Sequence, residues 1–348
     1  MNKLRYPEKK FLLKYDLNFQ FFRELGLNVT EVVPLRKVFL LKTDIGNKIL
    51  KCIDYDEDKI NFINISTESI AEEYKNIITL KKFKDGKCYK NWNGKNYIVM
   101  DLIKGREVVF TNIVELKRCA EELAKFHIAG NKKLGTIKKI MGEKIERFKE
   151  ATLIDRYKER LSALKYIKSV VQKYKCKNEF DSTFINRADN YLIESERICS
   201  LLNNKKVIDY ENDSKNKVLC HNDLANHNFL IKNNDIYLLD FDYASIDLRI
   251  ADVADLLLKG IKNVAFDFKK GMEVLEAYNK IYKLEELDYY MIYILMSFPR
   301  DIYAIVNNYY FKEKEWDYDI FLDRFKNKIE NEEDRIEFLE KFKTATLN

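Results

Sequence analysis

The 348-residue chain has little glycine and proline, only 10 and 3 residues. Glycine supplies positive φ angles and proline pre-sets turn geometry, so their scarcity disfavours a turn-rich all-β fold and favours long helices. No apolar run approaches transmembrane length, and the N-terminal stretch Met1–Pro7 lacks the pattern of a signal peptide. We therefore expect a protein without a membrane partner.

The six cysteines follow no framework spacing, and no Cys-x-x-Cys pair occurs among them. Disulfide scaffolds and most structural zinc sites need such spacings. We therefore expect free thiols in a reducing cytosol. A zinc site built from Cys220, His221 and His227 remains an alternative, although the chain has only three histidines and offers no paired cysteine.

A large excess of charge of one sign is also absent, because 62 basic and 56 acidic residues leave a net charge of +6. Nucleic-acid-binding proteins usually concentrate basic residues on one face or helix. A solvated surface of mixed charge explains this composition better, so we expect no nucleic-acid partner. Hydrophobic residues make up 46% of the chain, which is enough for two lobes with their own cores.

One segment near residue 230 is the most informative about function. Two apolar runs, Phe229–Ile231 and Ile236–Leu239, flank the polar stretch Lys232–Asp235 and predict a hairpin of short strands. The two open ends of a hairpin lie side by side. Polar residues that enter the first strand and leave the second are therefore expected to converge.

Four polar side chains occupy those ends: Asp223, Asn228, Asp240 and Asp242. Hard oxygen ligands crowded together suit Mg²⁺, which also binds substrate phosphates. The alternative is a polar hairpin in which Asp and Asn only form turns. Against this alternative, the residues occur in an order and spacing that a catalytic mechanism requires, which is more specific than an abundance of polar residues.

The spacing His-x-Asp-x-x-x-x-Asn, followed by Asp-Phe-Asp at 240–242, resembles the kinase-like phosphotransferases of the aminoglycoside and choline kinase type. The resemblance implies an α+β protein kinase-like fold, with a small antiparallel sheet lobe and a large, mainly helical lobe. It implies a reaction that uses ATP and Mg²⁺. Asp223 would orient the acceptor and accept its proton, Asn228 and Asp240 would hold the metal, and Asp242 would add a second acidic contact.

The pattern of strands and helices predicts a small lobe at 1–103 and a helical lobe at 104–348, with a hinge at about 100–105. Backbone groups around Met100 and Leu102 would bind adenine at that hinge, although the same strand also reads as a buried edge of the sheet. Helices are expected over 11–25, 66–83, 112–130, most of 136–215, 251–258, 266–282, 288–306 and 320–342.

Lys51 resembles the strand lysine that neutralises the nucleotide phosphates in kinases. The alternative for this residue is a solvated strand edge. Its anionic partner is sought on the helix expected over 66–83, where Glu73 falls on the apolar face and Glu72 on the opposite face. A carboxylate on an apolar face is costly unless it is paired, so an ion pair between Lys51 and Glu73 is predicted.

The chain departs from the protein kinase pattern because no Gly-x-Gly-x-x-Gly lies between its first strands. The turn at 33–37 contains no glycine, so other amides, or Arg36 or Lys37, would have to contact the phosphates. Many aminoglycoside kinase-like proteins also lack this triplet.

Further segments resemble the CotS-type spore coat proteins. The resemblance implies synthesis in the mother-cell cytoplasm, deposition on the spore coat, and other coat proteins as partners. Asp252 resembles an aspartate of the kinase-like superfamily that braces the catalytic loop, whereas its alternative role is a helix N-cap. His127 is expected to be a packing residue. The segments are Tyr97–Glu107, Cys220–Ile231, Leu238–Tyr243, Asp247–Ala254 and Ser297–Tyr303.

Two functions follow from these resemblances. The first is a spore coat-associated kinase that phosphorylates a hydroxyl or amine of a small molecule or a coat component. The alternative is a coat assembly protein that uses a kinase fold as a binding module with little turnover. Complete motifs favour the first function, while the missing glycine loop and the coat resemblance favour the second.

Overall fold

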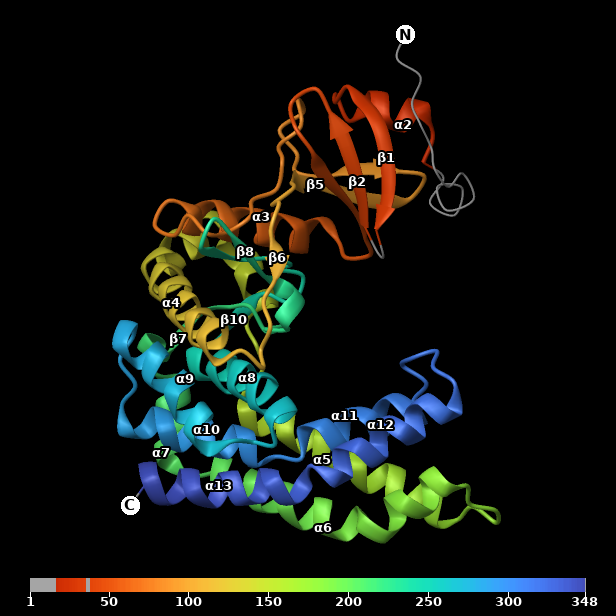
Figure 1. The fold of residues 1–348 in the computed structure, drawn as a ribbon, viewed down its shortest axis with the longest axis vertical. Coiled ribbons are helices and arrows are strands. Elements are labelled where there is room, and N and C mark those ends of the chain that lie inside the picture. The colour runs from red at the N-terminus through yellow and green to blue at the C-terminus, as the bar shows by residue number, and fades with distance from the viewer. Residues whose placement is uncertain (1–16, 36–37, 348) are drawn as a thin grey trace. The chain divides into compact units, whose positions relative to one another are not determined.

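The computed structural model describes residues 17–35 and 38–347. The chain divides into two compact units, which are described in turn (Figure 1). Unit 1 comprises Met1–Val108, Ile128–Phe148 and Asn226–Ala244, and unit 2 comprises Val109–His127, Lys149–Ala225 and Ser245–Asn348.

Unit 1 is built on a five-stranded antiparallel sheet with the strand order β1-β2-β3-β5-β4. Asn93 and Gly94 connect β4 to β5 and have φ angles of 48° and 78°. Two successive positive φ angles are what a tight two-residue hairpin turn requires. The strands are β1 (Val29–Leu35), β2 (Val38–Thr43), β3 (Lys48–Ile53), β4 (Lys90–Trp92) and β5 (Lys95–Asp101).

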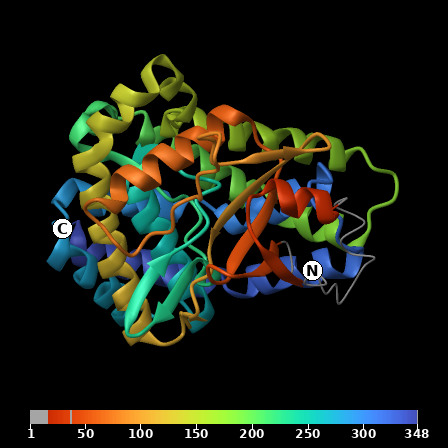
Figure 2. The same ribbon diagram turned by 90° about the horizontal axis from the view of Figure 1, so that it is seen from above.

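Helix α2 (Phe19–Glu24) packs on this sheet (Figure 2). Asn18 caps the helix, since its side chain accepts a hydrogen bond from the Phe21 amide at 3.0 Å. The Phe21 ring is fully buried, with its centroid 4.9 Å from that of Tyr97 on β5. The sequence predicted a helix over 11–25, whose first residues lie outside the described part of the chain.

Helix α3 (Glu57–Ala71) begins at Asp56, whose carboxylate accepts a hydrogen bond from the Lys59 amide at 3.0 Å. The prediction of a helix over 66–83 is therefore wrong beyond Ala71. After that residue the chain makes isolated bridges, one from Ile77 to Leu238 and another from Leu80 to Met100. The apolar residues that suggested a helical face pair with strands instead, because tertiary pairing overrides a short periodic pattern.

A second sheet of unit 1 confirms the predicted hairpin. Its strands have the order β6-β8-β9, and Asn233 and Asn234 turn between β8 and β9 with φ angles of 50° and 69°. Gly105 precedes β6, and a Cβ atom at this position would meet the Ile231 carbonyl oxygen at 2.6 Å. Only glycine therefore fits here. The strands are β6 (Arg106–Glu107), β8 (Phe229–Lys232) and β9 (Asp235–Leu238).

Unit 2 is mainly helical and contains one two-stranded sheet, β7 (Lys217–Cys220) with β10 (Ser245–Leu248). Helix α4 begins in this unit and ends in unit 1. The predicted helices over 288–306 and 320–342 are each interrupted, at Pro299 and Asn331. The helices are α4 (Ile113–Met141), α5 (Leu153–Gln172), α6 (Glu179–Leu202), α7 (Lys205–Asn212), α8 (Arg249–Ile261), α9 (Phe268–Ile281), α10 (Glu286–Ser297), α11 (Arg300–Tyr310), α12 (Tyr318–Glu330) and α13 (Glu332–Thr346).

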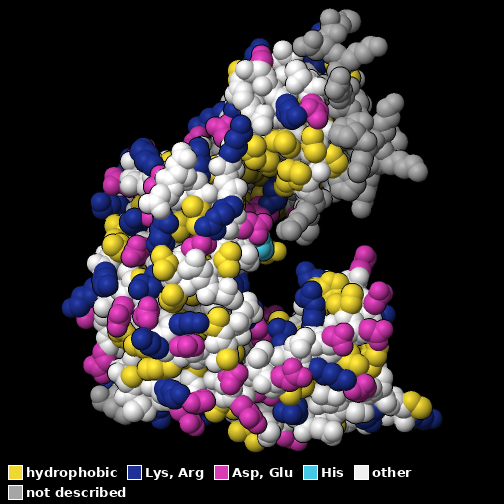
Figure 3. Space-filling model, viewed as in Figure 1, with side chains coloured by type: hydrophobic (Ala, Val, Ile, Leu, Met, Phe, Trp, Pro, Cys, Tyr) yellow, Lys and Arg dark blue, Asp and Glu magenta, His cyan; other side chains and the backbone are white. Residues whose placement is uncertain are grey.

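The surface in Figure 3 carries acidic and basic side chains in alternation, with no extended area of one sign on the face shown. Within the described residues, no helix combines the length and the apolarity needed to cross a bilayer. All six cysteines are described, and all are free thiols, as the spacing predicted.

The tight contact at Gly105 predicts a selective effect of a methyl group. Gly105→Ala should lower the free energy of unfolding by about 1–3 kcal/mol, the usual cost of overpacking, because β6 must move away from β8. Gly135→Ala on α4 is the control, since no atom lies within 4 Å of the added Cβ; alanine should there be neutral or stabilise by up to about 1 kcal/mol. Urea unfolding of both variants measures the difference, and equal stabilities would contradict the packing argument.

Candidate functional site

Lys51 stands at the centre of the site in unit 1. Its ammonium lies 2.7 Å from Asp240 Oδ1 and 2.6 Å from Asp242 Oδ2. The neighbouring Leu50 is fully buried in the core that α2 covers. Successive side chains of a strand point to opposite faces, so Lys51 faces away from that core. The structure thus brings together three of the residues that the sequence singled out.

The chain after β9 directs the two carboxylates to one place. Asp240 has a φ of 63°, in the left-handed region that a non-glycine residue enters only at a cost. Asn228 joins them through the backbone, because its carbonyl oxygen accepts a hydrogen bond from the Leu239 amide at 2.9 Å. Asn228 is itself buried. All three residues predicted to hold a metal therefore lie in one short stretch of unit 1.

Burial and charge oppose each other at these groups. Burial lowers the pKa of Lys51, but the carboxylates of Asp240 and Asp242 outweigh this effect and raise it, so the ammonium stays charged. Burial raises the pKa of Asp242, the neighbouring Asp240 adds to that rise, and Lys51 opposes it. Tyr55 donates a hydrogen bond to Asp242 Oδ1 at 3.1 Å. Burial raises the pKa of the Tyr55 phenol, so it remains a neutral donor.

The donor set fits a hard divalent cation. Two carboxylates already share one positive charge, the Lys51 ammonium, at contact distance. Without a cation, two such neighbouring carboxylates would repel each other. Asp240 and Asp242 oxygens, with the amide oxygen of Asn228 as a third ligand, are of the kind that Mg²⁺ prefers.

The structure contradicts the predicted ion pair between Lys51 and Glu73. The Glu73 carboxylate lies 3.3 Å from the ammonium of Lys132 and 3.7 Å from that of Lys133, both on α4. The helical-face argument fails because α3 ends at Ala71, so no helix fixes the direction of Glu73. Neither does Glu72 contact Lys51, since its carboxylate also binds Lys133.

Some backbone groups around the expected hinge already have hydrogen-bond partners in unit 1. The Leu102 amide donates to the Asn47 carbonyl at 3.1 Å, and Met100 pairs with Ile49 on β3. By contrast, the Ile103 amide has no hydrogen-bond partner in the described part of the chain. The Ile103 amide is thus an available backbone donor next to Met100 and Leu102, whose contact with adenine stays a prediction.

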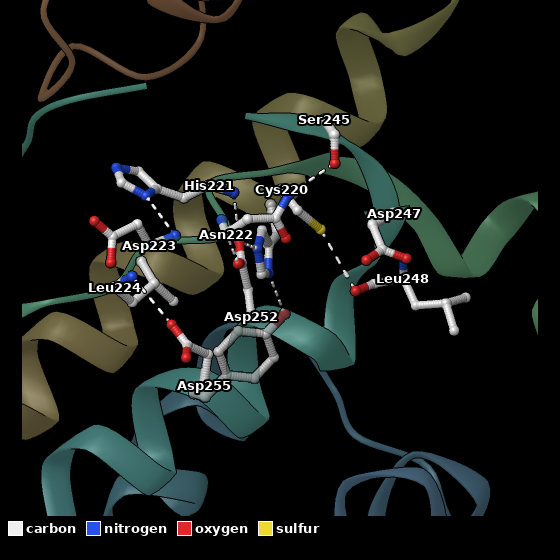
Figure 4. A network of polar contacts seen from close by, with 12 residues as sticks. Cys220, His221, Asn222, Asp223, Leu224, Ser245, Asp247, Leu248, Asp252 and Asp255 are labelled. Atoms are coloured by element: carbon white, nitrogen blue, oxygen red, sulfur yellow. Dashed lines mark hydrogen bonds and ion pairs between the residues drawn. The ribbon is translucent and has the colours of Figure 1, made fainter. Parts of the chain in front are cut away.

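In unit 2 a buried carboxylate holds the loop after β7 (Figure 4). Asp252 on α8 accepts hydrogen bonds from the amides of His221 and Asn222, at 2.7 Å and 2.8 Å. Burial would raise the pKa of Asp252, but its hydrogen bonds, foremost that from His127, lower it. The predicted bracing role is confirmed. The N-cap alternative is wrong, because Leu248 occupies the N-cap position of α8.

The side chain of Asp223, which lies in this loop, contacts a lysine that sequence reasoning missed. Its carboxylate lies 3.0 Å from the Lys259 ammonium, and Lys259 also lies 2.9 Å from Asp255. Asp255 in turn accepts a hydrogen bond from the Leu224 amide at 3.1 Å. The spacing of residues 252, 255 and 259 places them on one helical face, a signal that could have drawn attention to Lys259. The boundary between the two units lies between residues 225 and 226, so Asp223 belongs to unit 2 and Asn228 to unit 1.

His127 is a satisfied core histidine, as expected. It is fully buried, and its ring nitrogens lie 2.9 Å from the Tyr278 hydroxyl and 3.1 Å from Asp252. Among the described residues, His127, Cys220 and Asp252 bring possible metal-ligand atoms within 4.8 Å of one another. Burial raises the pKa of Cys220 far above its ordinary value, so the thiol stays protonated. This trio is not the predicted zinc alternative, which named His221 and His227.

Comparison with solved structures identifies the fold. The chain is similar to an aminoglycoside phosphotransferase from Alicyclobacillus acidocaldarius, with a TM-score of 0.80 and 15% identity over 95% of this chain and 96% of that one. It is also similar to AMP-bound spectinomycin phosphotransferase APH(9)-Ia (TM-score 0.67, 14% identity, 94% and 97% covered). The mixed α+β architecture is thus that of the kinase-like phosphotransferases, as predicted.

Sequence comparison then gives the family. Residues 27–342 match the family described as "Spore coat putative kinase YutH", and the chain belongs to this family. Spore coat protein S of Bacillus subtilis (strain 168) is 23% identical over 312 residues, which cover 88% of this chain and 86% of that protein. The predicted resemblance to spore coat proteins within the aminoglycoside phosphotransferase-like superfamily is therefore confirmed.

The brace at Asp252 predicts a loss of stability when its charge is removed. In Asp252→Asn, an amide group must face one of the N–H donors, so a buried donor is left unpaired at a cost of roughly 1–3 kcal/mol. Asp209→Asn on α7 is the control, because that carboxylate is exposed and pairs only with Lys205 in the preceding turn. Guanidinium unfolding measures both variants, and a brace variant as stable as the control would show that the loop does not depend on Asp252.

Proposed function

We propose that this protein is an ATP- and Mg²⁺-dependent phosphotransferase of the spore coat, acting on a hydroxyl or amine of a small molecule or coat component. The observation that carries the proposal is the convergence of Lys51, Asp240 and Asp242 within contact distance. A cation and two carboxylates in one place are what phosphoryl transfer needs for charge neutralisation. Within this proposal, residues 1–103 form the small lobe and 104–348 the helical lobe.

The reaction moves a phosphoryl group from ATP to the acceptor. The bond between the γ-phosphorus and the bridging oxygen breaks, a bond from that phosphorus to the acceptor oxygen or nitrogen forms, and ADP leaves. Asp223 orients the acceptor and takes its proton late in the step. Lys259, 3.0 Å away, holds the Asp223 carboxylate in place until then.

Asp240, Asp242 and Asn228 are the residues that would hold Mg²⁺. When bound, the metal neutralises the charge on the phosphates and helps to position them. Lys51 is then released from the two carboxylates to bind the phosphates itself. The amicoumacin kinase hAmiN, in a solved structure with AMP-PNP and Ca²⁺, is similar to this chain (TM-score 0.60, 16% identity, 98% of each chain covered) and supports a nucleotide with a divalent cation.

Adenine would bind at the end of β5. The Ile103 amide is a hydrogen-bond donor without a partner among the described residues, and such a donor suits a ring nitrogen of adenine. Arg36 and Lys37, the candidates for phosphate contacts in the absence of a glycine-rich turn, lie outside the described residues.

A second candidate function is a coat assembly protein that keeps the kinase fold with little turnover. One observation favours it: the Lys51 ammonium already forms ion pairs with both aspartates, which keeps these groups bound to one another in place of nucleotide and metal. Both functions are consistent with production in the mother-cell cytoplasm and deposition on the spore coat, where other coat proteins would be its partners.

Nucleotide binding tests the site in unit 1. A ligand at a hundredfold excess over its Kd stabilises the folded state by about 2.7 kcal/mol, so saturating MgATP should raise the melting temperature by several degrees. Asp240→Ala should abolish the metal-dependent part of this rise. Asp235→Ala, at the exposed start of β9, should keep it. If the wild type shows no shift at millimolar MgATP, the nucleotide site does not exist.

Catalysis tests the role of Asp223. Asp223→Asn nearly keeps the volume of the side chain, so the variant should fold and bind MgATP. Its phosphotransfer, or the slow ATP hydrolysis that replaces it without an acceptor, should fall by about 10²–10⁴-fold. Radiolabelled ATP with spore extract or a panel of polyols and amines measures the rate. A wild type that binds MgATP but never transfers phosphate would leave the assembly function as the better description.

A further inference from the structure

Unit 2 contains a pocket lined by none of the residues assigned to the reaction above. Its volume of about 410 Å³ lies in the range that proteins use to bind small molecules. It is bounded by the end of α8, the start of α11, and α12 with the connection before it. The lining side chains that matter here are Lys262, Arg300, Asp301, Trp316, Arg324 and Lys328.

Positive charge in this pocket exceeds the negative charge that faces it. Asp301 is shared by two lysines, with Lys328 at 3.3 Å and Lys262 at 3.6 Å. The guanidinium of Arg324 lies 4.0 Å from the centre of the Trp316 ring, and no carboxylate partner for it exists within the described residues. Asp301 therefore balances only part of the charge of Lys262 and Lys328, and the charge of Arg324 is not balanced by it.

The other charges of the wall are balanced by partners of their own. Arg335 Nη2 donates to both carboxylate oxygens of Glu194, at 2.9 Å and 3.0 Å. Glu332 lies 3.3 Å from Arg187. Burial would raise the pKa of Asp301, but the neighbouring Lys262 and Lys328 lower it. The excess charge is thus concentrated around Arg324, Lys262 and Lys328.

Two further features of the wall suit an anionic, hydroxylated ligand. Helix α11 begins at the pocket, and the N-terminus of a helix carries a partial positive charge. Side-chain amides both donate and accept hydrogen bonds, so they can bind hydroxyl groups in either sense. Figure 3 shows basic side chains beside hydrophobic ones in the region of α11 and α12. The amides that line the pocket are those of Asn263, Asn308, Asn327 and Asn331.

A continuous set of ion pairs connects the pocket to Asp223. Arg300 lines the pocket and lies 2.6 Å from Asp255. Asp255 lies 2.9 Å from Lys259, which lies 3.0 Å from Asp223. Arg300, which lines the pocket, therefore belongs to the network of ion pairs that fixes the proposed proton acceptor.

We propose that this pocket binds the phosphoryl acceptor, and that the acceptor is a small acidic polyol with a carboxylate or phosphate group. The anionic group is bound by Arg324, Lys262 and Lys328, and the amides bind its hydroxyls. This inference rests on the proposed phosphotransferase function, for which it supplies the class of substrate.

Binding of four matched sugars to the full chain, without nucleotide, tests the proposal by calorimetry. The probes are glucuronate, glucose 6-phosphate, neutral glucose and cationic glucosamine, each at millimolar concentration. One or both acidic probes should bind, and the two neutral or cationic probes should not. The stronger of the acidic probes identifies carboxylate or phosphate as the recognised group.

Variants locate the binding. In Arg324→Ala/Lys328→Ala the Kd of the acidic probe should rise at least about tenfold, because charge-assisted hydrogen bonds are lost. Lys326→Ala is the control, since this lysine lies on the same helix but pairs with Glu179 and does not line the pocket; its Kd should stay within about twofold of the wild type. Circular dichroism and the MgATP thermal shift establish that each variant is folded.

Three results would overturn the proposal: no binding of either acidic probe, equal binding of glucose, or a Kd that the double variant does not change. These failures are distinct from failure of the proposed function. If MgATP is bound and hydrolysed but no acidic sugar binds, the proposed role of the pocket is wrong and the proposed phosphotransferase function is not affected. If an acidic sugar binds through Arg324 and Lys328 but receives no phosphate from MgATP, the pocket stands and the phosphotransferase does not.

Discussion

The site in unit 1 depends on the repulsion between two carboxylates. Asp240 and Asp242 approach the same point, and a cation there relieves the repulsion between them. In the structure the cation is the Lys51 ammonium, at 2.7 Å and 2.6 Å. A divalent metal would fulfil the same requirement and free Lys51 for the nucleotide. Under the proposed function, the ion pairs of Lys51 and the binding of metal with nucleotide are two ways of relieving the same repulsion.

A second buried charge organises unit 2 in the same way. Asp252 has no exposed surface, so its carboxylate is tolerated only because backbone amides and His127 satisfy it. Those bonds hold the loop that carries Asp223, while Lys259 binds the Asp223 carboxylate from the side of α8. The proposed proton acceptor is therefore fixed by its backbone and by its charge, and Asp255 and Arg300 connect it to the pocket beside α11.

Sequence reasoning was most accurate where a role depends on neighbours along the chain. The hairpin of β8 and β9 was predicted from two apolar runs and a polar turn, and Asp252 and His127 were assigned correctly. Reasoning failed at Glu73, since the apolar residues after Ala71 pair with strands and not with a helical face. It also missed Lys259: the spacing of residues 252, 255 and 259 places this lysine on the face of Asp252, but only the folded chain brings Asp223 to it. The state of the backbone amides after β5 could not be read from the sequence either, because it depends on which strand lies beside them: the Leu102 amide donates to the Asn47 carbonyl.

The sequence by itself determined the kinds of groups in the site, the hairpin that carries Asp240 and Asp242, and the resemblance to the spore coat and phosphotransferase families. Only the tertiary structure decided which charge pairs with which, as with Lys51 and the two aspartates, or Glu73 and the lysines of α4. The same holds for the excess of positive charge in the pocket of unit 2. The physical reason is that turns and periodic patterns arise from local interactions, whereas electrostatic energy depends on distance in space, which only the folded chain defines.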